Sequence, residues 1–94
     1  MHKRRDLLDR ISENYLKKHE VACEMFLRML WEHYVKIDLE TGNQLADIFY
    51  DLYINKNKAS YDDIVFKYNI GLSTLNRYRI RFNELAEKLL PAQL

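Results

Sequence analysis

Apolar residues in the first third of the chain recur at the spacing of an α-helix. Leu8, Ile11 and Tyr15 are three and four residues apart. The same stripe continues at spacings of three, four and seven through Ala22, Met25 or Phe26, Met29 and Leu30. This spacing places side chains on one face of a helix. The polar residues 17–20 interrupt the stripe. We therefore predict that residues 5–37 form either one long helix or two helices with a bend.

The pattern that follows predicts further helices with recognisable ends. Residues 38–42 are expected to form a loop, and Asn43 is a suitable N-cap for a helix that ends near residue 54. Ser60 is expected to cap the next helix, because Asp63 follows it three residues later as in a capping box. That helix should end near Asn69, a residue that tolerates the left-handed conformation of a sharp turn.

Composition narrows the fold class. The chain has 94 residues with only 2 Gly and 1 Pro, too few turn residues for a β-sandwich or small barrel. Hydrophobic residues make up 48% and charged residues 31%, enough for a packed core and a hydrated surface. We predict a small all-α fold with four or five helices. No stretch approaches the ~18 apolar residues of a membrane span, and no signal peptide precedes Asp6, so a cytoplasmic location is expected.

Residues 60–82 have the organisation of a helix-turn-helix, in which two helices are separated by a short turn that contains Gly71. The second helix is predicted to run to about Leu90, with Pro91 just beyond its end. Its apolar positions, three and four residues apart, form one stripe: Leu75, Tyr78, Phe82, Leu85 and Leu89. The opposite stripe is mostly polar: Ser73, Asn76, Arg77, Ile80 and Glu84.

Charge is distributed unevenly along the chain. The net charge is only +1, so the total does not indicate a polyanionic partner. Residues 1–55 carry 8 Lys and Arg against 10 Asp and Glu, whereas residues 56–94 carry 7 against 4. Three arginines, at positions 77, 79 and 81, lie in the first half of the last helix. This basic segment is what a helix between two phosphate backbones requires.

The motif residues resemble a known family pattern. That pattern is an aromatic or hydroxyl start, an Ile followed by a small residue, a turn, and then Ser or Thr, Thr, an aliphatic residue, any residue and Arg. Here it appears as Tyr61, Ile64-Val65, Asn69-Ile70-Gly71, Ser73-Thr74-Leu75 and Arg77. The stretch resembles the helix-turn-helix of sigma factor region 4 and of small phage regulators of the ArpU and RinA kind. The resemblance covers roughly residues 43–90. Val65 departs from the usual small residue, and Gly71 from the usual Ser.

The resemblance implies a sequence-specific, DNA-binding transcriptional regulator whose recognition helix, about residues 72–90, enters the major groove. It also implies RNA polymerase as a partner. The base-reading residues would be Ser73, Asn76 and Arg77. The candidates for contacts with DNA phosphates are Lys56, Lys58, Tyr61, Lys67, Thr74, Arg79 and Arg81.

Residues 1–42 match no family pattern. We expect them to form a helical extension that dimerises or docks a partner, while residues 43–94 form the DNA-binding domain. The candidate contacts for a second copy or for RNA polymerase are Met25, Phe26, Met29, Leu30, Trp31 and Tyr34. A two-fold dimer would read two half-sites one helical turn of DNA apart, about 34 Å, or a multiple of that.

Other functions remain open at this point. A plain helical bundle could serve as an interaction module such as an anti-sigma or adaptor protein, which the net charge of −2 over residues 1–55 favours. A phage small terminase subunit also uses a helix-turn-helix to package DNA, and would form a ring. Salt dependence separates the first class from DNA binders, because neutralised phosphates make affinity fall steeply with salt.

Enzymatic chemistry is not indicated. The stretch from His19 to Cys23 resembles a zinc-binding HExxH helix, but Cys23 replaces the second His and no third ligand is suggested, so no metal site is expected. The carboxylate pairs at positions 20 and 24, and 47 and 51, are expected to be solvated. Cys23, the only cysteine, is expected to be a small buried hydrophobe. No cofactor is expected.

Overall fold

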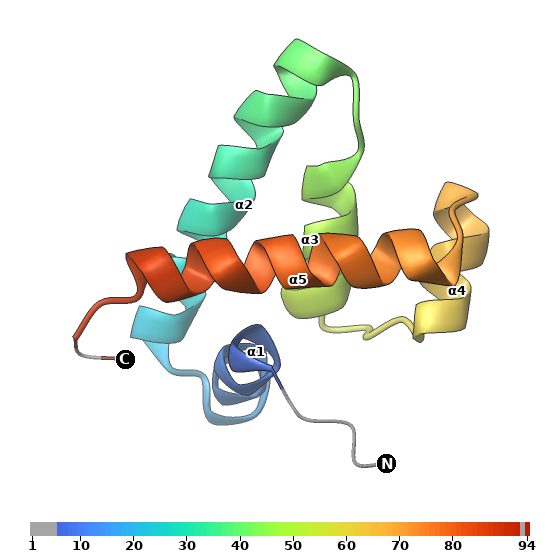
Figure 1. Ribbon diagram of the computed structural model, residues 1–94. Helices are drawn as coiled ribbons and strands as arrows, with labels where there is room; N and C mark the ends of the chain where they lie inside the picture. Colours follow the sequence, from blue (N-terminus) through green and yellow to red (C-terminus); the bar gives the residue numbers. More distant parts are fainter. Residues whose placement is uncertain (1–5, 93) are drawn as a thin grey trace.

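The protein folds into an arrangement of five helices (Figure 1), seen in a computed structural model that describes residues 6–92 and 94. All regular secondary structure in these described residues is α-helical, which confirms the predicted all-α class. The helices are α1 (Leu7–Lys18), α2 (Val21–Thr41), α3 (Leu45–Tyr53), α4 (Tyr61–Tyr68) and α5 (Leu72–Leu89).

The first apolar segment forms two helices, as the second of the two alternatives predicted. His19 adopts a left-handed conformation with φ of 55°, and its N–H donates to the carbonyl of Tyr15 at 3.0 Å. This cap ends α1 and turns the chain into α2. At the other end of α1, Asp6 and Asp9 form a capping box. The predicted start at Arg5 lies outside the described residues.

The loop predicted over residues 38–42 is wrong, because α2 continues to Thr41. No residue before Gly42 breaks the helix, and Gly42 ends it with φ of 72°. Asp38, placed on the last turns of α2, points across to the next helix. Its carboxylate accepts from the N–H groups of Leu45 at 3.0 Å and of Ala46 at 2.7 Å. Asp38 therefore caps α3, in place of the predicted Asn43.

A single hydrophobic core draws on every helix. Leu8 of α1, Leu30 of α2, Phe49 of α3, Ile64 of α4 and Leu75 of α5 are all 0% exposed and belong to one buried cluster. The expected boundary at residue 42 falls in the turn between α2 and α3, and the core continues across it.

Aromatic rings fill the centre of this core. Phe82 of α5 lies 4.8 Å from Tyr34 and 5.2 Å from Phe49, measured between ring centroids, and both pairs meet edge to face. Such edge-to-face pairs stabilise beyond the area that they bury. Tyr34, a residue of α2, therefore fixes the helix that carries the candidate DNA contacts.

The predicted helix-turn-helix ends are confirmed. Ser60 caps α4, since its hydroxyl accepts from the N–H of Asp63 at 3.1 Å and the Asp63 carboxylate accepts from the N–H of Ser60. Asn69 ends α4 with φ of 52°, and Gly71 stands at the N-cap of α5. The turn between α4 and α5 is thus three residues long.

Candidate nucleic-acid interface

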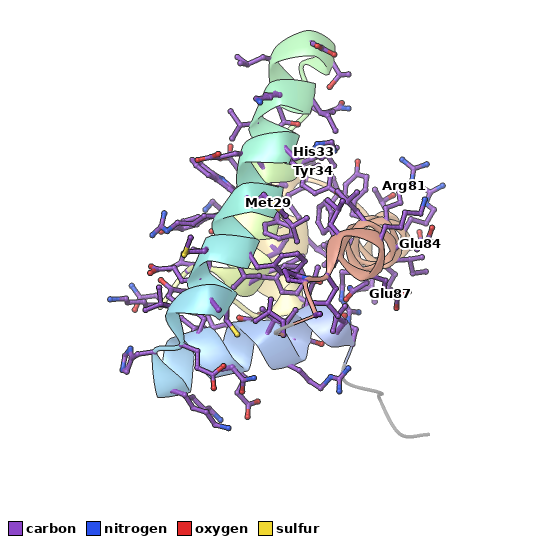
Figure 2. All side chains as sticks on the ribbon, turned by 90° about the vertical axis from the view of Figure 1, so that its left-hand side faces the viewer. Met29, His33, Tyr34, Arg81, Glu84 and Glu87 are labelled. Carbon is purple, nitrogen blue, oxygen red and sulfur yellow. The ribbon has the colours of Figure 1, made fainter. Side chains whose placement is uncertain are left out.

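One face of α5 is open to solvent along the length of the helix. Figure 1 shows α5 running across the front of the molecule, with α3 behind it. Leu75, Phe82 and Ala86 point into the core and are at most 1% exposed. The polar stripe on the opposite side is exposed, as the helical period requires: Ser73, Asn76, Arg77, Ile80, Arg81 and Glu84. In Figure 2, Arg81 and Glu84 lie on the side of α5 away from α2.

The three residues predicted to read bases lie together on the first turns of this face. Ser73, Asn76 and Arg77 are all exposed. Arg77 donates from Nη2 to the hydroxyl oxygen of Thr74 at 3.2 Å, and Asn76 accepts from Arg79 at 3.3 Å. These bonds orient both side chains along α5.

The residues predicted to contact phosphates differ in their exposure and in their contacts. Lys56 and Lys58, in the segment before α4, and Arg81 on α5 are exposed, and Thr74 is partly buried. Lys67 is exposed but binds the carboxylate of Asp51 at 3.0 Å. The remaining two predicted contacts, Tyr61 and Arg79, face the interior of the fold instead of the open face.

Arg79 joins three helices. Its Nη2 atom lies 3.1 Å from the Oδ2 atom of Asp6 and 3.9 Å from that of Asp9, at the start of α1. Its guanidinium carbon lies 4.5 Å from the centre of the Tyr61 ring of α4. The side chain is only 15% exposed, and its Nε atom is buried without a hydrogen-bond partner. Arg79 is therefore engaged within the fold, and Tyr61, which it contacts, is partly buried. The phosphate contacts of these two residues stay predictions.

The electrostatics around Arg79 follow from its burial. Burial by itself would lower the pKa of Arg79, but the nearby tyrosines and carboxylates outweigh it, so the pKa lies above the ordinary value. Burial, and next the neighbouring Asp6 carboxylate, raise the pKa of Asp9. The charge of Arg79 is thus balanced internally by α1. The exposed basic residues that remain on the first three turns of α5 are Arg77 and Arg81.

A second buried polar cluster holds α4 against α3. Asp51 of α3 is 5% exposed, so the expectation that it is solvated is wrong. It accepts from the hydroxyl of Tyr68 at 2.5 Å and from Lys67 at 3.0 Å, while Asn55 donates at 3.3 Å. Burial alone would raise the pKa of Asp51, but these hydrogen bonds outweigh it and lower the pKa. The charge is buried because Tyr68 and Lys67 satisfy it.

The residues of α2 that are predicted to contact a partner also differ in how exposed they are. Phe26, Leu30 and Tyr34 are at most 6% exposed and belong to the core, which corrects their assignment as surface contacts. Met25 is 66% exposed and Met29 is 45% exposed. Trp31 is partly buried and meets Tyr50 of α3. Sequence periodicity missed this division because α2 is apolar on more than one face.

Two further properties concern the described part of the chain as a whole. Among residues 6–92 and 94, no three His, Cys, Asp or Glu side chains are grouped to hold a metal ion. No helix among the same residues is long and apolar enough to cross a membrane.

Comparison with known proteins adds no relative. The chain matches no protein-family model, no curated protein and no solved structure. The resemblance to sigma factor region 4 and to ArpU-type regulators thus rests on the motif residues alone.

Proposed function

We propose that this protein binds double-stranded DNA through α5 and regulates transcription in the cytoplasm. The observation that carries the proposal is the exposed cluster of Ser73, Asn76 and Arg77 on the first turns of α5, directly after a three-residue turn. In a helix-turn-helix, these turns of the second helix contact the edges of bases. RNA polymerase and a second copy of the chain are the partners that this role implies.

Each exposed side chain has a contact that suits its chemistry. Arg77 can donate two hydrogen bonds to the O6 and N7 atoms of a guanine, and Asn76 can make a paired contact with an adenine. Arg81 lies one helical turn beyond Arg77 on the same face and suits a phosphate. Lys56 and Lys58, in the segment that leads into α4, would contact the backbone on the other side.

The first prediction tests this interface by fluorescence anisotropy. A labelled 30-base-pair duplex of mixed sequence is titrated with the wild-type protein and with Arg77→Ala/Arg81→Ala at 50 and 200 mM salt. We expect the variant to bind about tenfold more weakly at the lower salt. We also expect its salt slope to fall by about 1, because Arg81 is the phosphate contact that is lost.

A matched control removes two exposed basic residues from α1. The variant Arg10→Ala/Lys18→Ala changes the charge by the same amount away from α5, and we expect it to retain most of the wild-type affinity. Equal affinity of Arg77→Ala/Arg81→Ala and wild type would remove α5 from the interface. Absence of any duplex binding by the folded wild-type protein would reject the proposal.

A second candidate function, a protein-interaction module, is favoured by one specific observation. Phe66 of α4 is 88% exposed and Leu72 of α5 is 51% exposed, and both lie in the helix-turn-helix. Large apolar side chains at the surface are typical of sites that a protein partner covers. If duplex binding is absent, capture of purified RNA polymerase by wild type but not by Phe66→Ser would support this function.

A further inference from the structure

The outer face of α2 carries apolar and charged residues in a regular order. Val21 is 65% exposed and Leu39 is 83% exposed, and the two lie five helical turns apart on the same side of the helix. Met25 lies between them and is also exposed. Four charged residues are interspersed on this side: Glu24, Arg28, Glu32 and Lys36.

Within the part of the chain that the structure describes, no other helix covers this face. Figure 2 views the molecule from the side of α2, which lies in front of α3, with α1 below it and α5 to its right. An apolar groove with a volume of about 490 Å³ extends the face toward the C-terminal end of α5, between Met25 and Met29 on one side and Leu89 and Leu94 on the other. An apolar groove beside exposed apolar side chains, with charged residues among them, is typical of an interface.

We propose that α2 pairs with α2 of a second copy of this chain in an antiparallel, two-fold arrangement centred at residue 30. A two-fold interface is self-complementary, so a residue at position i meets the residue at position 60 − i of the other copy. Val21 then opposes Leu39, and Met25 opposes Val35. Arg28 opposes Glu32, and Glu24 opposes Lys36. Each of these pairs occurs twice.

The charge pattern selects this register over its neighbours. If the second copy slides by one helical turn in one direction, Arg28 meets Arg28 and Glu24 meets Glu32. A slide in the other direction brings Glu32 against Glu32 and Arg28 against Lys36. A parallel pair in register opposes each charge with its own copy. Like charges placed directly opposite one another disfavour all three alternatives.

The length of α2 suits such a contact. Its 21 residues extend about 31 Å, and the complementary pairs run from one end of the helix to the other. Helices that pack at a shallow angle of about 20° keep their faces in contact over several turns. The pairing leaves the exposed face of α5 untouched, so it does not depend on the proposed binding of DNA.

Charge reversal tests the pairing by sedimentation equilibrium. In a dimer of Arg28→Glu, the glutamate at position 28 faces Glu32 of the other copy. In a dimer of Glu32→Arg, Arg28 faces the arginine at position 32 of the other copy. We expect each variant alone to dimerise at least tenfold more weakly than wild type. In a mixture of the two variants every pair again has opposite charges, so we expect the mixture to recover wild-type affinity.

Two controls separate assembly from folding. Arg10→Glu, an exposed reversal on α1, should dimerise as wild type does. The thermal unfolding of each variant, followed by circular dichroism at low concentration, should show a folded protein. Each variant has the same sequence alone and in the mixture, so mixing does not change its intrinsic stability. Recovery on mixing therefore cannot arise from an effect on folding alone.

Cysteine cross-linking tests the direction of the helices. In the antiparallel pair, residue 21 of one copy lies beside residue 39 of the other, whereas two copies of residue 21 lie about 27 Å apart. We expect oxidation to cross-link a mixture of Val21→Cys and Leu39→Cys but neither variant alone. Cross-linking of Val21→Cys with itself would reject the antiparallel arrangement. A wild-type protein that stays monomeric at millimolar concentration, or no recovery on mixing, would overturn the proposal.

Discussion

Buried charges in this protein are balanced by residues far away in the sequence. Arg79 meets Asp6 across 73 residues, and Asp51 meets Tyr68 across 17. Removing one member of such a pair leaves the other desolvated and unsatisfied, which costs more than the pair contributes. The two clusters fix α1 against α5 and α3 against α4, so they orient the helix-turn-helix within the fold.

The second prediction concerns Asp51. Replacement by Asn removes the charge that Tyr68 and Lys67 stabilise, and we expect Asp51→Asn to lower the free energy of unfolding by about 2 kcal/mol at neutral pH. Urea denaturation at pH 7 measures this loss. A change below about 0.5 kcal/mol, the size of an ordinary surface substitution, would contradict the role assigned to the cluster.

The third prediction concerns pH. The pKa of Asp51 is lowered in the folded state, so its contribution to stability is present above the ordinary pKa of 3.8 and is lost as pH falls through the lowered value. The pKa of Asp9 is raised in the folded state, so its contribution to stability changes with pH in the opposite direction. We expect the stability difference between wild type and Asp51→Asn to shrink below pH 4 or so. Urea midpoints measured in steps from pH 7 to pH 2.5 follow it, and a constant difference would contradict the assignment.

At the scale of the element, helix ends are closed by local residues in some places and by a neighbouring helix in another. Asp6 and Ser60 cap the helices that they precede, through bonds within three residues. The start of α3 has no cap from its own N-cap residue, Gln44. Asp38 of α2 supplies both acceptors there, and its negative charge also suits the positive end of the α3 dipole.

The fourth prediction follows from this cap. We expect Asp38→Ala to lower the free energy of unfolding by 1–2 kcal/mol, about the effect of losing a strong N-cap. Asp38→Asn keeps one acceptor and should lose less. Asp47→Ala removes an exposed carboxylate from the first turn of the same helix and serves as the control. Chemical denaturation of the four proteins ranks them, and an equal loss in Asp38→Ala and Asp47→Ala would reject the cap.

At the scale of the whole molecule, the helices share one core, and α4 and α5 are built into it. Phe82 of α5 packs against Tyr34 of α2, and Asn83 accepts from the backbone N–H of Leu8 at 2.9 Å. Ser12 of α1 donates to the carbonyl of Tyr53 at 2.6 Å. Residues 7–41 therefore cover apolar and polar groups that the motif cannot satisfy alone.

The fifth prediction tests this dependence. A fragment of residues 43–94 would expose Phe49 and Phe82 to water, and we expect it to lack the cooperative thermal unfolding of the full chain. Circular dichroism in the far ultraviolet, which reports helix content, and the spread of amide signals in NMR measure folding. A fragment that unfolds cooperatively would show that residues 43–94 form an independent domain.

Local sequence patterns are enough to predict the helices and most of their ends. Periodic apolar residues, the capping box at Ser60 and the left-handed Asn69 act within a few positions along the chain, so their effect can be read locally. The open polar face of α5 follows from the same period. The boundary of α2 was the exception, because Asp38 is polar but serves a different helix.

Which of these residues remain at the surface depends on how the helices pack against one another in three dimensions. Arg77 and Arg79 are two arginines in the first half of the same helix. Arg79 is nevertheless enclosed by Asp6 and Tyr61, while Arg77 is exposed. Met25 and Phe26 are adjacent and both apolar, yet only Met25 is exposed. The physical reason is that local spacing fixes the direction of a side chain around its own helix, whereas burial depends on distant helices that pack there.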